Sequence, residues 1–143
     1  MGLWRKLSLG FAAGALGAVA NVVFVAIVAG LGISAALDIH APRPPMPAFL
    51  YKQIAWGGLW GFALVLPVLS GKWWQRGLIL GLLASLVAML IFLPRIVMPP
   101  TAPFPSPGFF GLGWGAMMPV LILVANSVWG LAAAWWYARM TRE

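Results

Sequence analysis

Four long apolar stretches, separated by short polar or proline-rich segments, dominate the chain. They cover residues 7–33, 53–71, 77–93 and 109–137. About 20 helical residues cross a hydrocarbon core of ~30 Å, so each stretch is long enough to span a bilayer. In lipid the backbone must satisfy its own hydrogen bonds, and no stretch alternates as a barrel strand does. The pattern therefore predicts an all-α integral membrane protein, a bundle of four transmembrane helices in a single domain over residues 1–143.

Proline marks the expected ends of these helices. The two longer connections, residues 38–52 and 94–108, contain the segments APRPPMP and PPTAPFPSPG, which favour extended backbone. Pro67 and Pro94 are expected to end the second and third helices. Pro119 falls within the fourth stretch, where the loss of a backbone hydrogen bond predicts a kink.

Composition excludes a soluble globule. Apolar residues make up 63% of the chain and charged residues 8%, which is too little polar surface to solvate a water-soluble domain. The net charge of +7 does not indicate a nucleic-acid partner, because the basic residues lie in short clusters beside apolar stretches. The chain has no cysteine, so disulfides, thiolate metal ligands and cysteine nucleophiles are excluded.

The distribution of lysine and arginine predicts the orientation. Under the positive-inside rule, the side with more basic residues faces the cytoplasm. Both termini are placed there, because one side carries Arg5, Lys6, Lys72, Arg76, Arg139 and Arg142 and the other carries Arg43, Lys52 and Arg95. We expect the first stretch to be retained rather than cleaved, since it is about twice as long as the apolar region of a signal peptide.

A shift of 58 residues indicates an internal duplication. It superposes Pro42 on Pro100 and the dipeptide Trp56-Gly57 on Trp114-Gly115. The first predicted helix then pairs with the third, and the second with the fourth, in the same direction. The chain would consist of two parallel-repeat helical hairpins related by an axis along the membrane normal.

Glycines recur at four-residue spacing in every predicted helix, as they do where helix backbones pack closely. The pairs are Gly10 and Gly14, Gly57 and Gly61, Gly77 and Gly81, and Gly111 and Gly115. We expect packing within the chain, and the alternative is a glycine pair that faces a partner chain. The WGGLWG motif comprises Trp56, Gly57, Gly58, Trp60 and Gly61. The sequence leaves two interpretations of it open: a knob-and-hole packing surface, or a face that binds a flat ligand such as a quinone, carotenoid or sterol.

A few polar residues lie at similar depth near the middle of the predicted helices: Asn21, Ser85, Asn126 and Ser127. An amide in hydrocarbon needs a partner, so we expect a hydrogen bond between Asn21 and Asn126 that holds two helices together. A midplane site for a substrate or ion is the alternative. The four stretches contain no Asp, Glu, Lys, Arg or His, which disfavours ion-coupled transport.

Asp38, His40 and Arg43 form a polar cluster in the first outer connection. One imidazole and one carboxylate are too few ligands for a structural zinc, and no second histidine can complete a haem pair. We expect a salt bridge or loop anchor. No nucleophile accompanies His40, so the sequence predicts no metal site, no catalytic residue and no enzymatic activity.

Two segments, YKQIAWGGLWGFALVLP at 51–67 and LVANSVWGL at 123–131, resemble a set of small bacterial inner-membrane proteins of unassigned function. The likeness covers about a quarter of the chain and depends on the WGGLWG and NSVWG strings. It implies a four-helix fold in a bacterial inner (cytoplasmic) membrane, and it brings no binding or catalytic residues.

Three functional hypotheses follow. The first is a non-catalytic accessory subunit of a larger inner-membrane complex, respiratory or photosynthetic, because little of the chain lies outside the membrane. The second is a small homo-oligomeric transporter or channel, based on the duplication and the mid-depth polar residues. The third is a lipid- or quinone-binding membrane protein. The expected partners are the lipid bilayer and other membrane subunits or a second copy, and any cofactor is a bound lipid, quinone or carotenoid.

Overall fold

The computed structural model describes residues 1–67 and 71–141, and this part of the chain is helical and contains no strand. Three helical segments are long and apolar enough to cross a membrane, Leu3–Gly30, Trp73–Arg95 and Met118–Thr141. Their outer faces expose large apolar side chains, with about half of Ile27, Leu82 and Val120 accessible. Such a surface is typical of a protein that lipid rather than water surrounds.

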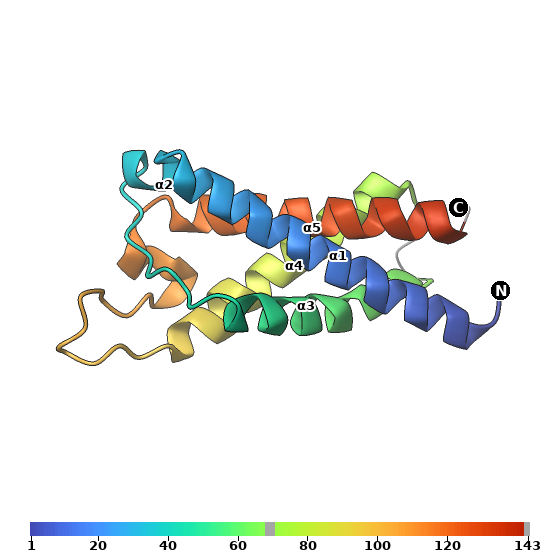
Figure 1. Ribbon diagram of the computed structural model, residues 1–143, viewed down its shortest axis with the longest axis horizontal. Coiled ribbons are helices and arrows are strands. Elements are labelled where there is room, and N and C mark those ends of the chain that lie inside the picture. The colour runs from blue at the N-terminus through green and yellow to red at the C-terminus, as the bar shows by residue number, and fades with distance from the viewer. Residues whose placement is uncertain (68–70, 142–143) are drawn as a thin grey trace.

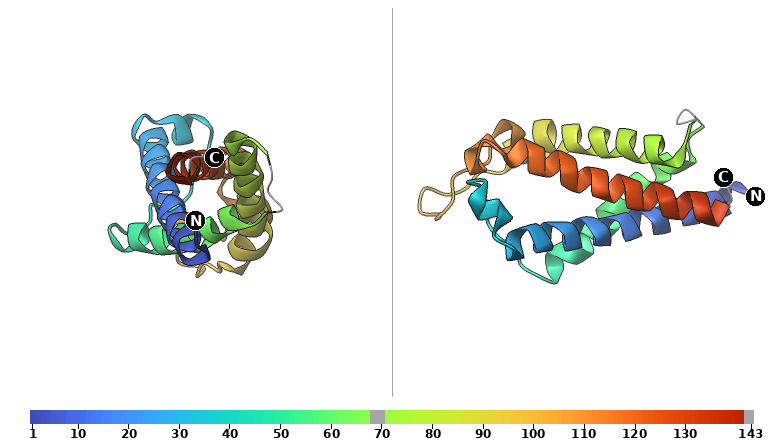
Figure 2. Two further views of the ribbon diagram at one scale, coloured as in Figure 1. Left: turned by 90° about the vertical axis from the view of Figure 1, so that its right-hand side faces the viewer. Right: turned by 90° about the horizontal axis from the view of Figure 1, so that it is seen from above.

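Four helices run along the long axis, each opposite in direction to the one before it (Figure 1). They are α1 (Leu3–Gly30), α3 (Ala48–Gly61), α4 (Trp73–Val87) and α5 (Met118–Thr141). The start of α1 and the end of α5 lie at one end of the molecule, and the proline-rich connections lie at the other (Figure 1). Viewed along the axis, the helices are arranged in the order α1, α5, α4 and α3 (Figure 2).

Local sequence explains most helix ends. α1 stops before Gly32, whose φ of 76° is left-handed and suits glycine, and the single turn α2 (Ile33–Ala36) follows. α3 begins at Ala48, within the connection predicted for residues 38–52 and not at residue 53. It tightens into the 3-10 turn η1 (Phe62–Val65) just before Pro67, which ends the helix as expected. α4 begins after Lys72, whose backbone N–H donates to the Gln75 side chain at 3.0 Å.

Two turns that are not α-helical continue the helix beyond the C-terminal end of α4. They are the π-helical turn η2 (Ala88–Phe92) and the 3-10 turn η3 (Leu93–Arg95), which contains Pro94. Pro94 therefore ends the third helix as expected. The predicted second helix included residues 68–70, which lie outside the described residues, as do Arg142 and Glu143.

The fourth helix begins at residue 118, and not at 109 as the apolar pattern predicted. The preceding 3-10 turn η4 (Phe109–Trp114) contains Phe110 and Gly111 at left-handed φ values of 59° and 70°, which an α-helix excludes. Pro119 therefore lies in the first turn of α5, where its missing N–H costs no helical hydrogen bond. The expected kink is wrong, and Gly111 and Gly115 are not a helical glycine pair.

The other glycine pairs bring helix backbones together within the chain. A Cβ atom added to Gly14 in α1 would lie 2.1 Å from the carbonyl oxygen of Gly57 in α3. A Cβ added to Gly130 in α5 would lie 2.0 Å from the carbonyl oxygen of Gly77 in α4. The chain thus forms two hairpins, α1–α3 and α4–α5, and each is joined through a glycine seam.

Candidate functional site

A cavity of about 850 Å³ lies between α1, α3, α5 and the helical segment formed by α4, η2 and η3. α1 packs on α3 and on α5, and α5 packs on α4, whereas α3 and α4 make few contacts with each other. The cavity separates these two helices. Trp56 of α3 and Phe92 of η2 both line it and meet edge to face, with ring centroids 5.2 Å apart.

The second helices of the two hairpins line the cavity with equivalent positions. α3 contributes positions 49, 52, 53, 56, 57 and 60, and α5 contributes positions 118, 121, 122, 125, 126 and 129, each 69 residues after its counterpart. The seams have nearly the same offset, because Gly61 meets Gly10 as Gly130 meets Gly77. The cavity therefore lies between two halves that present the same helical faces.

The structure does not support the 58-residue register, and the duplication itself stays a prediction. The 58-residue shift pairs Trp56, inside α3, with Trp114, which precedes α5. The 69-residue offset instead aligns WGGLWG at 56–61 with ANSVWG at 125–130, so that Trp60 corresponds to Trp129. The prolines of the two connections favoured the shorter shift, although they share only composition.

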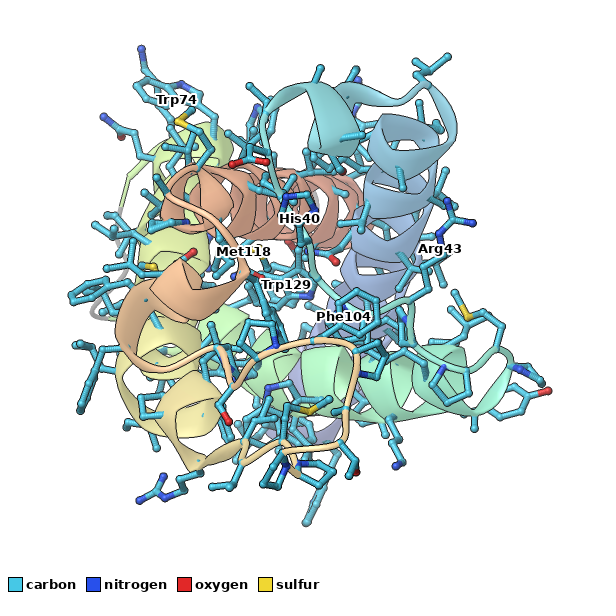
Figure 3. All side chains as sticks on the ribbon, turned by 90° about the vertical axis from the view of Figure 1, so that its left-hand side faces the viewer. His40, Arg43, Trp74, Phe104, Met118 and Trp129 are labelled. Carbon is cyan, nitrogen blue, oxygen red and sulfur yellow. The ribbon has the colours of Figure 1, made fainter. Side chains whose placement is uncertain are left out.

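The two corresponding tryptophans have different environments. Trp129 is buried near the centre of the four helices (Figure 3), where its indole N–H donates to the carbonyl oxygen of Gly14 at 3.0 Å. Trp60 lies against the cavity and packs at a steep angle on Trp56, with centroids 6.4 Å apart. Both tryptophans line the cavity, and Trp129 in addition joins α5 to α1.

The WGGLWG motif divides its residues between packing and the cavity. Gly57 and Gly61 approach the backbone of α1, and a Cβ on Gly58 would lie 2.6 Å from the ring of Phe11. Trp56 and Trp60 line the cavity, together with one face of Gly57. The glycines therefore serve packing, and the tryptophans line the cavity, so the flat-ligand interpretation stays a prediction.

The mid-depth polar residues do not pair as the sequence predicted. The Asn126 amide donates to the hydroxyl of Ser85 at 3.2 Å, and no hydrogen bond joins it to Asn21. Ser85 is fully buried and donates to the Gly81 carbonyl at 2.8 Å. Asn21 lines the cavity, and its amide has no hydrogen-bond partner in residues 1–67 or 71–141. The Ser127 hydroxyl donates a hydrogen bond to the Leu123 carbonyl oxygen of its own helix at 2.7 Å.

Replacing Ser85 with alanine should lower the free energy of unfolding by about 0.6 to 1.7 kcal/mol, because Asn126 loses its interhelical partner. Thermal unfolding in detergent, followed by circular dichroism, measures the change. Ser127→Ala is the matched control, since its hydroxyl bonds only within α5, and it should leave stability nearly unchanged. Equal losses for both variants would contradict an interhelical role for Ser85.

Among the described residues, the polar ones that line the cavity lie on α1, α3 and α5, and none lies on the α4 side. Asn21, Lys52, Gln53 and Asn126 line it from α1, α3 and α5. The helical segment that begins with α4 lines it with apolar residues: Ala84, Ala88, Phe92, Leu93 and Ile96. Lys52 and Gln53 were not among the sequence candidates. Their counterparts at the 69-residue offset, Leu121 and Ile122, also line the cavity and were not sequence candidates either.

The outer-loop cluster does not line the cavity. His40 Nε2 lies 2.6 Å from the Asp38 carboxylate, both side chains are exposed, and Arg43 points away from the molecule (Figure 3). The backbone N–H of His40 donates to the Trp114 carbonyl at 2.7 Å, which fastens this loop to the turn before α5. The described residues contain no group of three His, Asp or Glu side chains arranged to hold a metal ion.

Comparisons with protein families, with curated proteins and with solved structures give no match. Function is therefore argued from the cavity itself.

Proposed function

We propose that this chain is a four-span protein of a bacterial cytoplasmic membrane that binds one amphipathic, largely apolar molecule in the cavity between its two hairpins. The observation that carries the proposal is the set of equivalent positions with which α3 and α5 face the same space. A space of about 850 Å³ is within the usual size range of small-molecule sites, which are mostly apolar with a few placed polar groups.

The length of α3 supports a fourth membrane span. Its 14 α-helical residues and the four 3-10 residues of η1 extend about 29 Å, at ~1.5 and ~2.0 Å per residue. This is close to the ~30 Å of the hydrocarbon core. The excess of basic residues beside the start of α1 and the end of α5 supports a cytoplasmic location for that end.

The lining indicates the kind of ligand. Trp56, Trp60 and Phe92 offer flat apolar surfaces, which suit rings or alkyl chains. The Asn21 amide, at mid-depth on α1, supplies a donor and an acceptor that a ligand carbonyl or hydroxyl can satisfy. Because an unsatisfied amide in hydrocarbon is costly, a polar group on the ligand at this depth stabilises the complex.

Mass spectrometry of the protein extracted in mild detergent tests the proposal. We expect a co-extracted apolar molecule at close to one per chain, retained through washing and released when the protein is denatured. Lipids bound on the outer surface of the protein are the reference for retention, since they exchange with detergent during washing. Extraction of a folded chain with only exchangeable lipid would contradict the proposal.

A transporter is the second candidate function, and the repeat favours it. Carriers built from parallel repeats bind their substrates near the midplane at the repeat interface, and this cavity lies between corresponding helices. The molecule identified by mass spectrometry can be enclosed in liposomes that contain the protein. Its passage across the membrane distinguishes transport from simple binding.

The hypothesis of an accessory subunit remains a proposal, supported by the second proline-rich connection. Residues 96–108 project beyond the helix ends (Figure 1), and Val97 is 83% exposed. A segment that projects from the bundle can be reached by a neighbouring membrane subunit. Copurification of unlike chains at fixed stoichiometry would support this role, which is compatible with ligand binding.

A further inference from the structure

The charge of the cavity lining identifies the chemical class of the ligand more closely. We infer that the ligand is an anionic amphiphile whose carboxylate or phosphate head group is held by Lys52 and whose apolar body lies against the α4 side. This inference rests on the proposed function, because it concerns the molecule that the cavity binds.

Lys52 is the charged residue among those that line the cavity in the described part of the chain. It lies near the start of α3, at the end of the molecule with the proline-rich connections, and Gln53 lines the cavity beside it. Their counterparts in the other half are Leu121 and Ile122. The duplicated faces therefore differ by one cation and one amide, both on α3.

No carboxylate of the described residues neutralises this lysine. Asp38 is the one acidic residue in that part of the chain. Its carboxylate lies 2.6 Å from His40 Nε2, and neither residue lines the cavity. Lys52 is exposed, so its ammonium group is accessible to an anionic head group at the edge of the cavity. A ligand with an acidic head group supplies that anion.

The apolar side fixes the orientation of such a ligand. Ala84, Ala88 and Phe92 succeed one another along the segment that faces α3, and they carry no polar group. A chain that starts at Lys52 can follow this side inward past Trp56 and Trp60. A neutral amphiphile of the same length would make the same apolar contacts and lose the contact with the ammonium group.

A matched pair of ligands tests the inference. The full chain in detergent is titrated with 9,10-dibromostearate, whose bromine atoms quench nearby tryptophans, and the probe is displaced with oleate or oleyl alcohol. Trp56, Trp60 and Trp129 line the cavity and report occupancy. We expect oleate to bind about tenfold more tightly than the alcohol, because a hydrogen bond to a charged group is lost.

Lys52→Gln should remove this preference, and Lys52→Arg should keep it. Lys72→Gln is the control, since Lys72 directly precedes α4, which begins at the opposite end of the molecule (Figure 1), and should not affect either affinity. Hexadecyl phosphate is compared with oleate, and the tighter binder assigns the head group as a phosphate or a carboxylate.

The possible failures are distinguishable. Equal affinity of wild-type protein for oleate and oleyl alcohol, or an unchanged preference in Lys52→Gln, would overturn the anionic ligand and leave the binding cavity intact. If Ala88→Phe, which narrows the cavity, is quenched as strongly as the wild type, the probe does not enter the cavity and the proposed function fails as well.

Discussion

Replacing Gly14 with alanine is expected to lower the free energy of unfolding by about 3 kcal/mol, the upper end of the usual cost of overpacking a core. The added methyl group would lie 2.1 Å from the carbonyl oxygen of Gly57 and 2.8 Å from the Cα of Gly61. These are backbone atoms of α3, so relief requires the two helices to move apart. Gly130→Ala should have a similar effect on the α4–α5 hairpin, where the Gly77 carbonyl lies 2.0 Å away.

Gly30→Ala is the matched control for these seam variants. It lies in α1, and a Cβ there meets nothing within 4 Å. Intrinsic propensity favours alanine over glycine in a helix by about 0.8 to 1.0 kcal/mol, so the control should be neutral or slightly stabilising. Unfolding in mixed micelles, followed by circular dichroism, compares the variants. Equal stability of Gly14→Ala and Gly30→Ala would show that the seam is not a close contact.

Ala88→Phe is expected to lower the amount of co-extracted ligand about tenfold while the helices remain folded. Ala88 lines the cavity on the apolar side, at the start of the π-helical turn η2. A phenyl ring there occupies space that the ligand needs, and overlap of this kind costs about 1 to 3 kcal/mol of binding. Mass spectrometry of the extracted variant measures the ligand-to-protein ratio.

Ala55→Phe makes the same change of volume on the outer face of α3. Ala55 is exposed and is not among the residues that line the cavity, so its variant should retain the ligand at the wild-type ratio. Thermal unfolding of both variants confirms that they are folded. A wild-type ligand ratio in Ala88→Phe would contradict binding in this cavity, whatever the molecule retained.

The sequence predicted the long helices because their apolar runs are longer than those of helices in soluble proteins. Leu3–Gly30 and Trp73–Arg95 coincide closely with apolar stretches, and Pro67 and Pro94 end helices as expected. The segment FFGLGW is apolar as well, yet it is not α-helical. Hydropathy does not report left-handed φ values, and the glycines between residues 108 and 115 were the available signal.

The candidate site was predicted only in part. Trp56, Trp60, Asn21 and Asn126 were chosen from their residue types, and all four line the cavity. Lys52 was counted only as a basic residue flanking a helix, because nothing in a linear pattern tells whether a residue near a helix end faces lipid or an interior space. The partner of Asn126 was also missed, since Ser85 became its neighbour only through the close α4–α5 seam.

If the two hairpins packed symmetrically, α1 would contact α5 and α4 would contact α3 in the same way. Only the first of these contacts is close. α1 docks on α5 through Gly17, where a Cβ would lie 2.5 Å from the Trp129 carbonyl, while the corresponding faces of α4 and α3 stand apart. Trp129 packs between α5 and α1, whereas its counterpart Trp60 lines the cavity. The cavity is therefore the place where the second contact between the hairpins is left unpacked.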